Sequence, residues 1–181
     1  MFDKIKPALV LMTICLVVAA ALIVTYNLTN VDNEGVLTAE LEQACIDVLG
    51  DGEYTIVDTK IEGISKVIKA ESGDGIAIEV IASGYVKDGL NILVGMNMDG
   101  EIEGVSVVNN AETPGLGTKV EEDSFISQFV GKSQTLKGVA SASGDDEIEV
   151  ISGATSSSDG MIDGVNAAIE AFEQAKEAAN E

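Results

Sequence analysis

The sequence predicts an α+β protein, with a single N-terminal transmembrane helix followed by one domain in which helices pack on an antiparallel sheet. Three observations lead to this prediction. An uncharged apolar run lies near the N-terminus, short segments rich in β-branched residues follow one another between turn signals, and apolar residues recur at helical spacing at both ends of the remaining chain. With 181 residues, 46% of them hydrophobic, the chain has room for one membrane segment and one domain with a sizeable core.

The apolar run extends from Ala8 to Tyr26 and contains no charged residue. About 19 helical residues at roughly 1.5 Å each span about 30 Å, the thickness of the hydrocarbon core of a bilayer. A cleaved signal peptide is the alternative, because residues 19–21 are small, but the run is longer than the usual apolar region of a signal peptide and continues past them. We therefore expect a cytoplasmic tail over 1–7, a transmembrane helix over 8–26 and a domain over 27–181.

Lysines flank only one side of this run. Lys4 and Lys6 precede it, whereas Asp32 and Glu34 follow it and the next lysine is Lys60. Because cytoplasmic flanks are enriched in positive charge, we expect a single-pass protein of the cell membrane with its N-terminus in the cytoplasm and its C-terminal domain outside.

The overall charge narrows the range of partners. Ten basic residues against 31 acidic ones give a net charge of -21, which argues against nucleic-acid binding and against broad docking onto anionic lipid headgroups. The two cysteines, Cys15 and Cys45, cannot form a disulfide framework if the first lies in the bilayer, so each is expected to be a buried free thiol.

The first half of the domain is predicted to form a helix and then strands. Apolar residues at helical spacing indicate a helix over 36–49, which ends at a Gly-Asp-Gly sequence. The clearest unit is a hairpin in which a tight turn at Asp99-Gly100 joins two strands. The strands expected in this region are Tyr54–Val57, Ile64–Ala70, Gly75–Ile81, Leu90–Met98 and Ile102–Val108.

The second half is predicted to contain two helices and one more strand. Residues 119–130 form a short helix in this interpretation, with Val120, Phe125, Ile126 and Phe129 on its apolar side. A strand is expected over 148–151. A longer helix should follow, because an apolar stripe consisting of Met161, Val165, Ala168, Ile169 and Phe172 continues towards the C-terminus.

The junction of that strand and the last helix reads SGATSSS, residues 152–158. Ser157 or Ser158 is expected to cap the helix, whose unpaired first-turn amides would make an anion site suited to a phosphate. In isolation such a stretch more often means only a capped helix and a turn. Thr155 is a poor hydrolase nucleophile, because the chain contains no histidine that could act as its base.

This stretch resembles the flavinylation motif of the FMN-binding domain family, found in the G subunits of Rnf complexes and the C subunits of Na+-translocating NADH:quinone reductases. The match is Ser152-Gly153-Ala154-Thr155, preceded by an acid and Ile151 and followed by Ser157-Ser158; Glu149 stands where the family usually has aspartate. In that family a flavin transferase takes FMN from FAD and leaves it on the motif threonine as a phosphoester. The resemblance therefore implies covalent FMN on Thr155.

A second motif supports the first. The sequence from Asn110 to Gly117 contains E-T-P-G-L-G, which resembles the family's loop beside the flavin, and an E-E-D-S-F-x-x-Q-F stretch follows it. Pro114-Gly115 is a turn signal of type II character, and we expect the glycines to let the backbone approach a flat ring. The resemblance implies that the cofactor-binding residues, besides Thr155, are Ser152, Gly153, Ala154, Ser156, Ser157, Ser158, Glu112, Thr113, Pro114, Gly115, Leu116, Gly117 and Thr118.

The family implies a function in electron transport. The chain looks like the electron-relay subunit of an Rnf ferredoxin:NAD+ oxidoreductase, which couples electron flow to Na+ or H+ translocation. Implied partners are the FMN-carrying D subunit, the A and E subunits, the flavin transferase and membrane lipid. The chain has no cysteine cluster, haem-ligating histidine or Rossmann fingerprint, so we expect no metal, no second redox centre and no substrate site of its own.

Alternatives remain at this stage. The C subunit of a quinone reductase shares both motifs. A membrane-anchored binding or assembly module without redox function would apply if the domain were never flavinylated. A carboxylate hydrolase is disfavoured, because acidic runs are usually solvated surface. Of the lysines, Lys119 and Lys137 are the two expected near the flavin phosphate.

Overall fold

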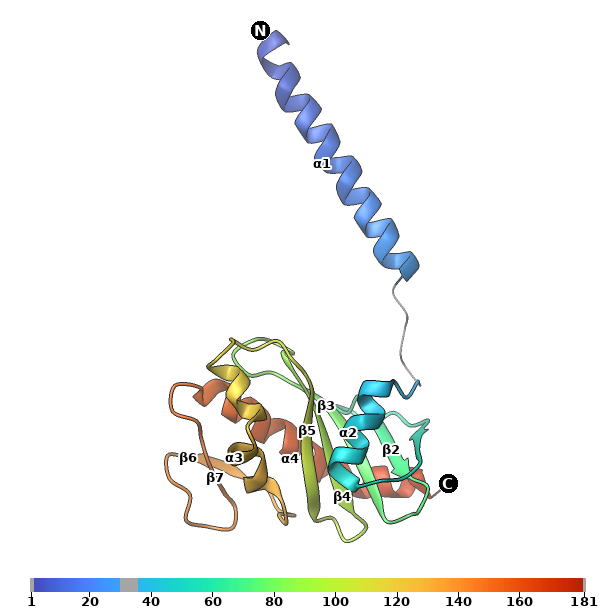
Figure 1. The fold of residues 1–181 in the computed structure, drawn as a ribbon, viewed down its shortest axis with the longest axis vertical. Helices are drawn as coiled ribbons and strands as arrows, with labels where there is room; N and C mark the ends of the chain where they lie inside the picture. The colour runs from blue at the N-terminus through green and yellow to red at the C-terminus, as the bar shows by residue number, and fades with distance from the viewer. Residues whose placement is uncertain (1, 30–35, 181) are drawn as a thin grey trace. The chain divides into compact units, whose positions relative to one another are not determined.

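The computed structural model describes residues 2–29 and 36–180, which belong to two separate compact units, 1–34 and 35–181. The first unit contains a single helix, α1 (Phe2–Thr29) (Figure 1). Its stretch Lys6–Tyr26 is long and apolar enough to cross a membrane by length and composition. Thr13 and Thr25 donate their hydroxyls to carbonyls one turn back, Leu9 O and Ala21 O, so these polar groups are satisfied within the helix.

Two sequence-based expectations for this region have different outcomes. Cys15 was expected to be a thiol buried in the bilayer, and within the protein itself it is exposed on α1. Asp32 and Glu34, on which the expected orientation depends, lie outside the described residues.

The second unit is built on a five-stranded sheet, and every neighbouring pair in it is antiparallel, as predicted. The strands follow one another in chain order: β1 (Tyr54–Val57), β2 (Lys66–Ala70), β3 (Gly75–Ala82), β4 (Leu90–Asn97) and β5 (Ile102–Asn110). The predicted hairpin is β4–β5. At its turn, Asn97 Oδ1 accepts hydrogen bonds from Asp99 N and Glu101 N, both at 3.0 Å.

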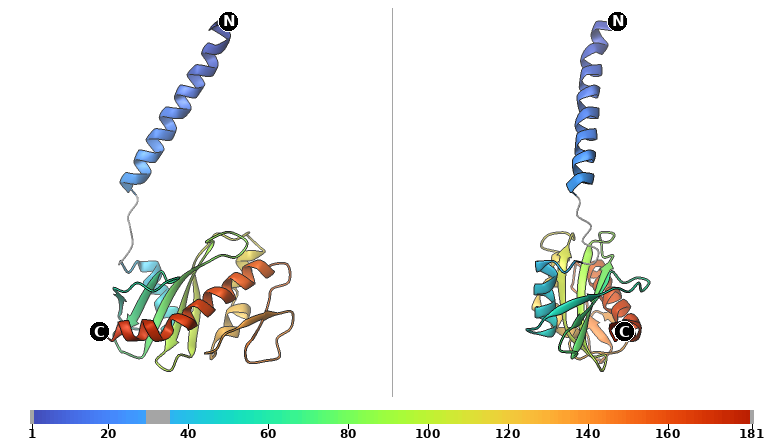
Figure 2. Two further views of the ribbon diagram at one scale, coloured as in Figure 1. Left: turned by 180° about the vertical axis from the view of Figure 1, so that it is seen from behind. Right: turned by 90° about the vertical axis from the view of Figure 1, so that its right-hand side faces the viewer.

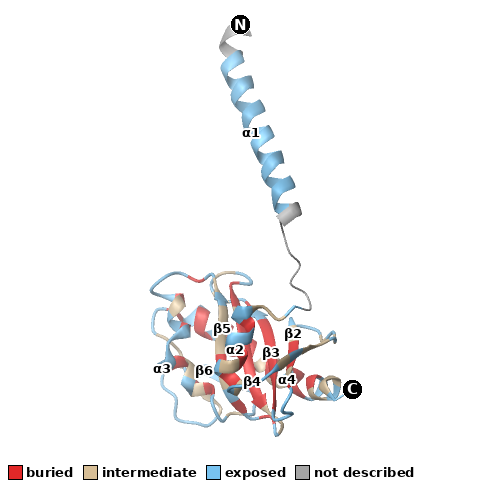
Figure 3. Cartoon of the chain, turned by 45° about the vertical axis from the view of Figure 1, so that its right-hand side comes forward, coloured by how far each residue is buried: buried red, intermediate tan, exposed pale blue. Residues whose placement is uncertain are grey.

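One helix covers each face of this sheet (Figure 2). On one face lies α2 (Ala39–Leu49), where Thr38 Oγ1 caps the helix by accepting from Leu41 N. On the other lies α4 (Thr155–Ala179). Because both faces are covered, the central strand β3 is buried along almost its whole length. Figure 3 shows the buried residues of the domain in red.

The two faces of the sheet belong to two hydrophobic clusters. The smaller cluster, under α2, consists of Leu41, Ala44, Cys45, Val48, Ile68, Ala77 and Leu93. The larger one, under α4, joins Ile78 and Ile92 of the sheet to Met161 and Val165 of the helix. It also takes in the aromatic pair Phe125–Phe129, whose rings meet edge to face at 5.5 Å. The core therefore fixes α4 across the sheet.

The helix predicted over 119–130 is instead three short pieces: η1 (Gly117–Glu121), α3 (Asp123–Ile126) and η2 (Ser127–Phe129). The chain is extended at Glu122, with φ -68° and ψ 137°. Val120 and Phe125 are both buried, yet residues five apart lie about 140° apart around a continuous helix. The break at Glu122 is what turns both side chains inward.

The strand predicted over 148–151 is shorter and has an unpredicted partner. It is β7 (Glu147–Glu149), which pairs in parallel with β6 (Lys137–Val139) in a separate two-stranded sheet. Ile151 lies beyond it, where the chain turns into α4. A three-residue strand without hydrophobic alternation gives almost no sequence signal, so β6 was not predicted.

Candidate functional site

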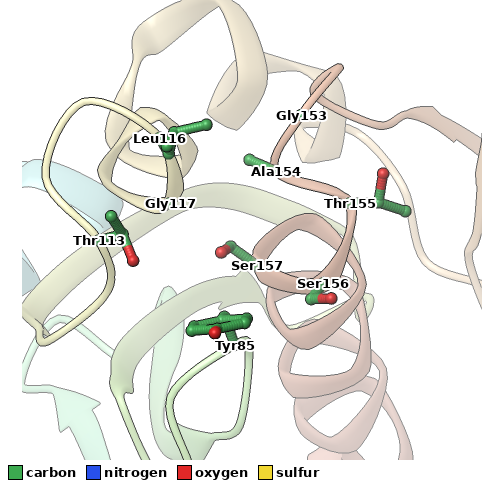
Figure 4. Close-up of a pocket in the computed structure, with 9 residues that line it drawn as sticks. All are labelled: Tyr85, Thr113, Leu116, Gly117, Gly153, Ala154, Thr155, Ser156 and Ser157. Carbon is green, nitrogen blue, oxygen red and sulfur yellow. The ribbon is translucent and has the colours of Figure 1, made fainter.

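A cleft of about 500 Å³ opens where three segments of the domain meet (Figure 4). The segments are the loop after β3, the loop after β5 and the first turn of α4. The lining residues are Tyr85, Thr113, Leu116, Gly117, Gly153, Ala154, Thr155, Ser156 and Ser157. The volume lies within the range typical of sites for small molecules and cofactors, about 300–1,000 Å³.

The loop after β5 forms one wall through a tight turn. Thr113 O accepts from the amides of Leu116 at 3.1 Å and Gly117 at 2.9 Å, and Gly115 N donates to Thr118 Oγ1 at 2.9 Å. Gly115 has φ +74°, as the expected type II turn requires. The turn leaves the Leu116 side chain 47% exposed in the cleft, where it offers an apolar surface.

The opposite wall is the start of α4, and here the predicted cap is wrong. The helix begins at Thr155, so Ser157 and Ser158 lie inside its first turn. Ser158 Oγ donates to Ala154 O and accepts from Ile151 N, both at 3.0 Å, which fastens the turn before the helix. The N-cap position is Ala154, whose methyl group cannot accept a hydrogen bond, and Gly153 turns the chain just before it with φ +84°.

This arrangement leaves the helix start open to an anion. The first helical hydrogen bond runs from Ser158 N to Ala154 O, so the amides of Thr155, Ser156 and Ser157 precede the ladder. These amides and the dipole of a 25-residue helix give the N-terminus of α4 a positive potential. Thr155 and Ser156 are exposed at the rim, and in Figure 4 Ser157 lies between Thr155 and Thr113.

The third segment, the loop after β3, contributes Tyr85, a lining residue that no sequence pattern indicated. Its ring is 76% exposed at the cleft. The loop is closed by Ser83 Oγ, which accepts from Asp88 N at 2.9 Å, and Asp88 takes the unusual φ of +53°. A single exposed tyrosine in a loop follows no periodic pattern, so only the folded chain shows that it faces the motifs.

Glu112, expected to contact the cofactor, does not line the cleft. It is 3% exposed, and its carboxylate accepts hydrogen bonds from Tyr85 N at 3.2 Å, Val86 N at 2.8 Å and Ser157 Oγ at 2.5 Å. The residue lies behind the cleft and contacts all three of its segments.

The stretch after the loop motif also has a structural role. The Gln128 side chain accepts from Glu149 N at 2.7 Å and donates to Glu149 O at 3.3 Å. This pair of hydrogen bonds joins η2 to the end of β7. It therefore fixes the strand from which the chain enters SGAT.

Neither lysine expected near a phosphate lines the cleft. Lys137 pairs instead with Asp146 at 3.0 Å and Glu147 at 3.4 Å, and the hydrogen bond from Lys137 to Asp146 is the main cause of the raised pKa of Lys137. Lys119 is exposed and does not line it either. Among the described residues, the groups at the cleft that suit an anion are therefore backbone amides and hydroxyls.

The predicted site residues thus fall into two groups. Those that line the cleft are Thr113, Leu116, Gly117, Gly153, Ala154, Thr155, Ser156 and Ser157. Ser158, Glu112, Gly115 and Thr118 do not line it but make hydrogen bonds that hold its walls. Ser152 and Pro114 are exposed neighbours of lining residues and do not line it themselves. Both motifs converge on one cavity, although Glu112 and Ser157 are 45 positions apart in the sequence.

An FMN fits the chemistry of this cleft. A flat apolar ring system suits the exposed surfaces of Leu116 and Tyr85 and the side-chain-free backbone at Gly117 and Gly153. A phosphate suits the helix start and the hydroxyls beside it. The apolar and anion-binding ends lie within the same cavity.

Comparison with known proteins gives the same assignment. The model of a family described as the FMN-binding domain matches residues 84–170. The chain is 35% identical, over 96 residues, to the G subunit of the Na(+)-translocating ferredoxin:NAD(+) oxidoreductase complex of Acetobacterium woodii, covering 50% of this chain and 45% of that protein. It is 31% identical, over 136 residues, to the C subunit of the Na(+)-translocating NADH-quinone reductase of Vibrio anguillarum, covering 69% and 49%.

The chain spans about half the length of these curated relatives. The fold also resembles a solved structure, that of Shewanella oneidensis NqrC, with a TM-score of 0.53 at 19% identity, covering 80% of this chain and 78% of that one. At this identity the likeness concerns the fold, and it agrees with the predicted α+β domain with an antiparallel sheet.

Proposed function

Because the domain over residues 84–170 belongs to the FMN-binding domain family, we propose that the chain carries FMN covalently on Thr155 and relays electrons within an ion-translocating membrane oxidoreductase. The observation that carries this proposal is the convergence of the two motif loops on one cleft, with the Thr155 side chain exposed at its rim. An exposed hydroxyl is what a transferase needs in order to reach an acceptor.

Each wall of the cleft has a part in this proposal. Thr155 supplies the oxygen that is esterified to the phosphate, while the first-turn amides of α4 and the Ser156 hydroxyl stabilise the phosphate charge. Leu116 and Tyr85 cover the ring and exclude water from it. Bound FMN supplies one- and two-electron transfer, which side chains alone cannot perform. The tether keeps the cofactor at high effective concentration, so it is not lost by dilution outside the cell.

We propose an Rnf-type complex as the setting, with a quinone reductase as the second candidate. Several of the similar proteins are G subunits of ion-translocating oxidoreductase complexes, and one is the C subunit of a quinone reductase. In this proposal α1 anchors the chain, residues 1–7 are cytoplasmic and the FMN domain is outside. The domain exchanges electrons with membrane-embedded neighbours, among them the FMN-carrying D subunit and the A and E subunits, and the complex moves Na+ or H+.

The test is made on the chain purified from its native membranes. The wild type should fluoresce as a flavoprotein in a denaturing gel and carry the mass of one FMN less one water, because the ester oxygen comes from the threonine. Thr155→Ala should lose both signals. Ser141→Ala, which removes an exposed hydroxyl that does not line the cleft, should keep both signals. A colourless, unmodified wild-type chain would overturn the proposal, and so would undiminished flavin on Thr155→Ala.

A further inference from the structure

Glu112 is a buried carboxylate without a cationic partner. It is 3% exposed, and Ser157, to which it is bonded, is 2% exposed. Its side-chain partners are two backbone amides and one hydroxyl, and no lysine is among its contacts in the described part of the chain. Every partner is a donor, so both oxygens act as acceptors, as a carboxylate requires. Burying such a group is costly unless its hydrogen bonds are well made, so its position calls for an explanation.

The carboxylate connects segments that lie far apart in the sequence. Oε1 accepts from Val86 N at 2.8 Å; Oε2 accepts from Tyr85 N at 3.2 Å and from Ser157 Oγ at 2.5 Å. Glu112 N in turn donates to Asn110 Oδ1 at 2.8 Å, which fixes the residue at the end of β5. One side chain therefore joins the loop after β3, the loop after β5 and the first turn of α4.

Three glycines lie so close to this carboxylate that a larger residue at their positions would crowd it. A Cβ added at Gly117 would lie 2.7 Å from both Glu112 Cβ and Ser157 Oγ. At Gly84 it would lie 2.9 Å from Glu112 Oε1 and 3.0 Å from Ser157 Cα, and at Gly89 3.1 Å from Oε1. These short distances show that the backbone of the loops after β3 and β5 packs directly on the Glu112 side chain, while α4 reaches it through the Ser157 hydroxyl.

We propose that Glu112 is a positioning residue with an electrostatic effect: it holds the three walls of the cleft together and places a negative charge behind the bound flavin. This rests on the proposed function, since the charge matters only if FMN occupies the cleft. Adding electrons to a flavin adds negative charge, and a buried carboxylate nearby opposes this more strongly than one in water. Glu112 therefore lowers the reduction potential of the flavin.

The positioning part is tested without the cofactor. In the unmodified full-length chain in detergent, amide hydrogen exchange of residues 83–89 should be about fivefold faster or more in Glu112→Gln. Glutamine keeps the shape, but its amide nitrogen cannot accept from Tyr85 N, so one bond to the loop is lost. Asp74→Asn removes a charge at the exposed turn before β3, at the other end of that strand, and should leave the exchange unchanged.

The electrostatic part is tested on the flavin-loaded full-length chain. Glu112→Gln should shift the midpoint potential in the positive direction. Glu112→Asp, which keeps the charge on a shorter side chain, should loosen residues 83–89 in the same way but leave the potential closer to that of the wild type. If Glu112 had only a structural role, Glu112→Gln and Glu112→Asp would shift the midpoint potential by similar amounts. Asp74→Asn again serves as the charge-matched control.

The outcomes separate the two proposals. If the wild type carries no flavin, the proposed function fails, and the exchange measurement still decides whether Glu112 fastens the loop. If Glu112→Gln leaves both the exchange and the potential at wild-type values, this inference is overturned while the flavin assignment stands. If Glu112→Gln does not fold, Ser157→Ala replaces it: it removes one donor and keeps the charge, and unchanged exchange of residues 83–89 would overturn the positioning role.

Discussion

Ser157 Oγ donates a hydrogen bond to Glu112 Oε2 at 2.5 Å, and both side chains are buried. The contact joins the two sequence motifs directly, one from the loop after β5 and one from the start of α4. A hydrogen bond to a buried carboxylate contributes more than one between neutral groups. The relative position of the two cleft walls is therefore set by side chains that do not face the solvent, and the site can stay open without losing its shape.

Gly117→Ala should distort the cleft. Its Cβ would meet buried atoms of Glu112 and Ser157 at 2.7 Å, which overpacks the centre of the site. Overpacking costs about 1–3 kcal/mol, so we expect a loss of this size in the free energy of unfolding and a lower fraction of flavinylated protein. Urea unfolding and in-gel fluorescence measure the two effects.

Gly115→Ala is the matched control in the same turn. Within the described domain, a Cβ at Gly115 meets nothing within 4 Å. The cost there is conformational, about 1–2 kcal/mol for a left-handed residue, and the cleft keeps its shape. Equal loss of flavin in both variants would contradict the distinction between them.

Gly160→Ala should destabilise the domain although alanine favours helix. In α4 a Cβ at this position would lie 2.6 Å from Ser83 O and 2.7 Å from Gly84 Cα, which are backbone atoms that cannot rotate away. The helix would have to move off the end of β3. We expect the free energy of unfolding to fall by about 1–3 kcal/mol, measured by urea titration.

Gly164→Ala, one turn further along α4, provides the comparison. Its Cβ would meet Ile92 Cδ1 at 2.5 Å, the far end of a side chain that can change rotamer, and Ala82 Cβ at 3.0 Å, which needs a shift of a few tenths of an ångström. The gain in helix propensity, about 1 kcal/mol, can then offset the crowding. A Gly160→Ala protein as stable as Gly164→Ala would show that α4 does not rest on the loop after β3.

Cys45 should be inert to thiol reagents in the folded protein. It is fully buried on the side of α2 that faces the sheet. Burial is the main cause that raises the pKa of its thiol to about 12, and the nearby carboxylates of Glu79 and Glu42 add to it. Only the thiolate reacts, so at about pH 8 labelling must wait for unfolding. In a full-length Cys15→Ser chain, maleimide labelling should be slow and should accelerate with urea. Fast stoichiometric labelling of the folded protein would refute the burial of this helix face.

The loop before β7 should loosen in acid. Amides of Ser143 at 2.9 Å and Gly144 at 3.0 Å donate to the Glu147 carboxylate, and these bonds, the first foremost, hold the pKa of Glu147 below its usual value. A lowered acid pKa means that the stabilisation is present above the ordinary value and is lost as the pH falls through the folded one.

The measurement is a pH titration of the Ser143 and Gly144 amide chemical shifts. Both should move together, with a midpoint below that of an ordinary glutamate. Glu147→Gln should abolish the transition. A midpoint at or above the ordinary value would mean that these amides do not bind the ionised carboxylate.

Sequence patterns were informative where a residue's environment is local. The β4–β5 hairpin was predicted because Asp99-Gly100 is a turn signal between two apolar runs, and β1 was predicted to the residue. Sequence patterns were less informative where tertiary contacts determine the backbone conformation. The break at Glu122 exists because Val120 and Phe125 must both face the core, and no local signal records that requirement.

The candidate site shows the same division. Both motif loops were found from the sequence, but the roles within them were not. Ser158 fastens a turn instead of capping the helix, and Glu112 lies behind the cleft instead of in it. Tyr85 was missed altogether, since its place at the cleft depends on the packing of β3 beside α4.

No single stretch of chain forms the cleft, because its walls come from three separate segments. The segment at the start of α4 is synthesised after the other two. A growing chain presents the threonine as soon as that stretch emerges, but it presents a place for the ring only after the C-terminal helix has packed across the sheet. In the proposed function, attachment of the cofactor therefore depends on this packing, and a chain truncated within α4 would keep Thr155 while losing the cavity beside it.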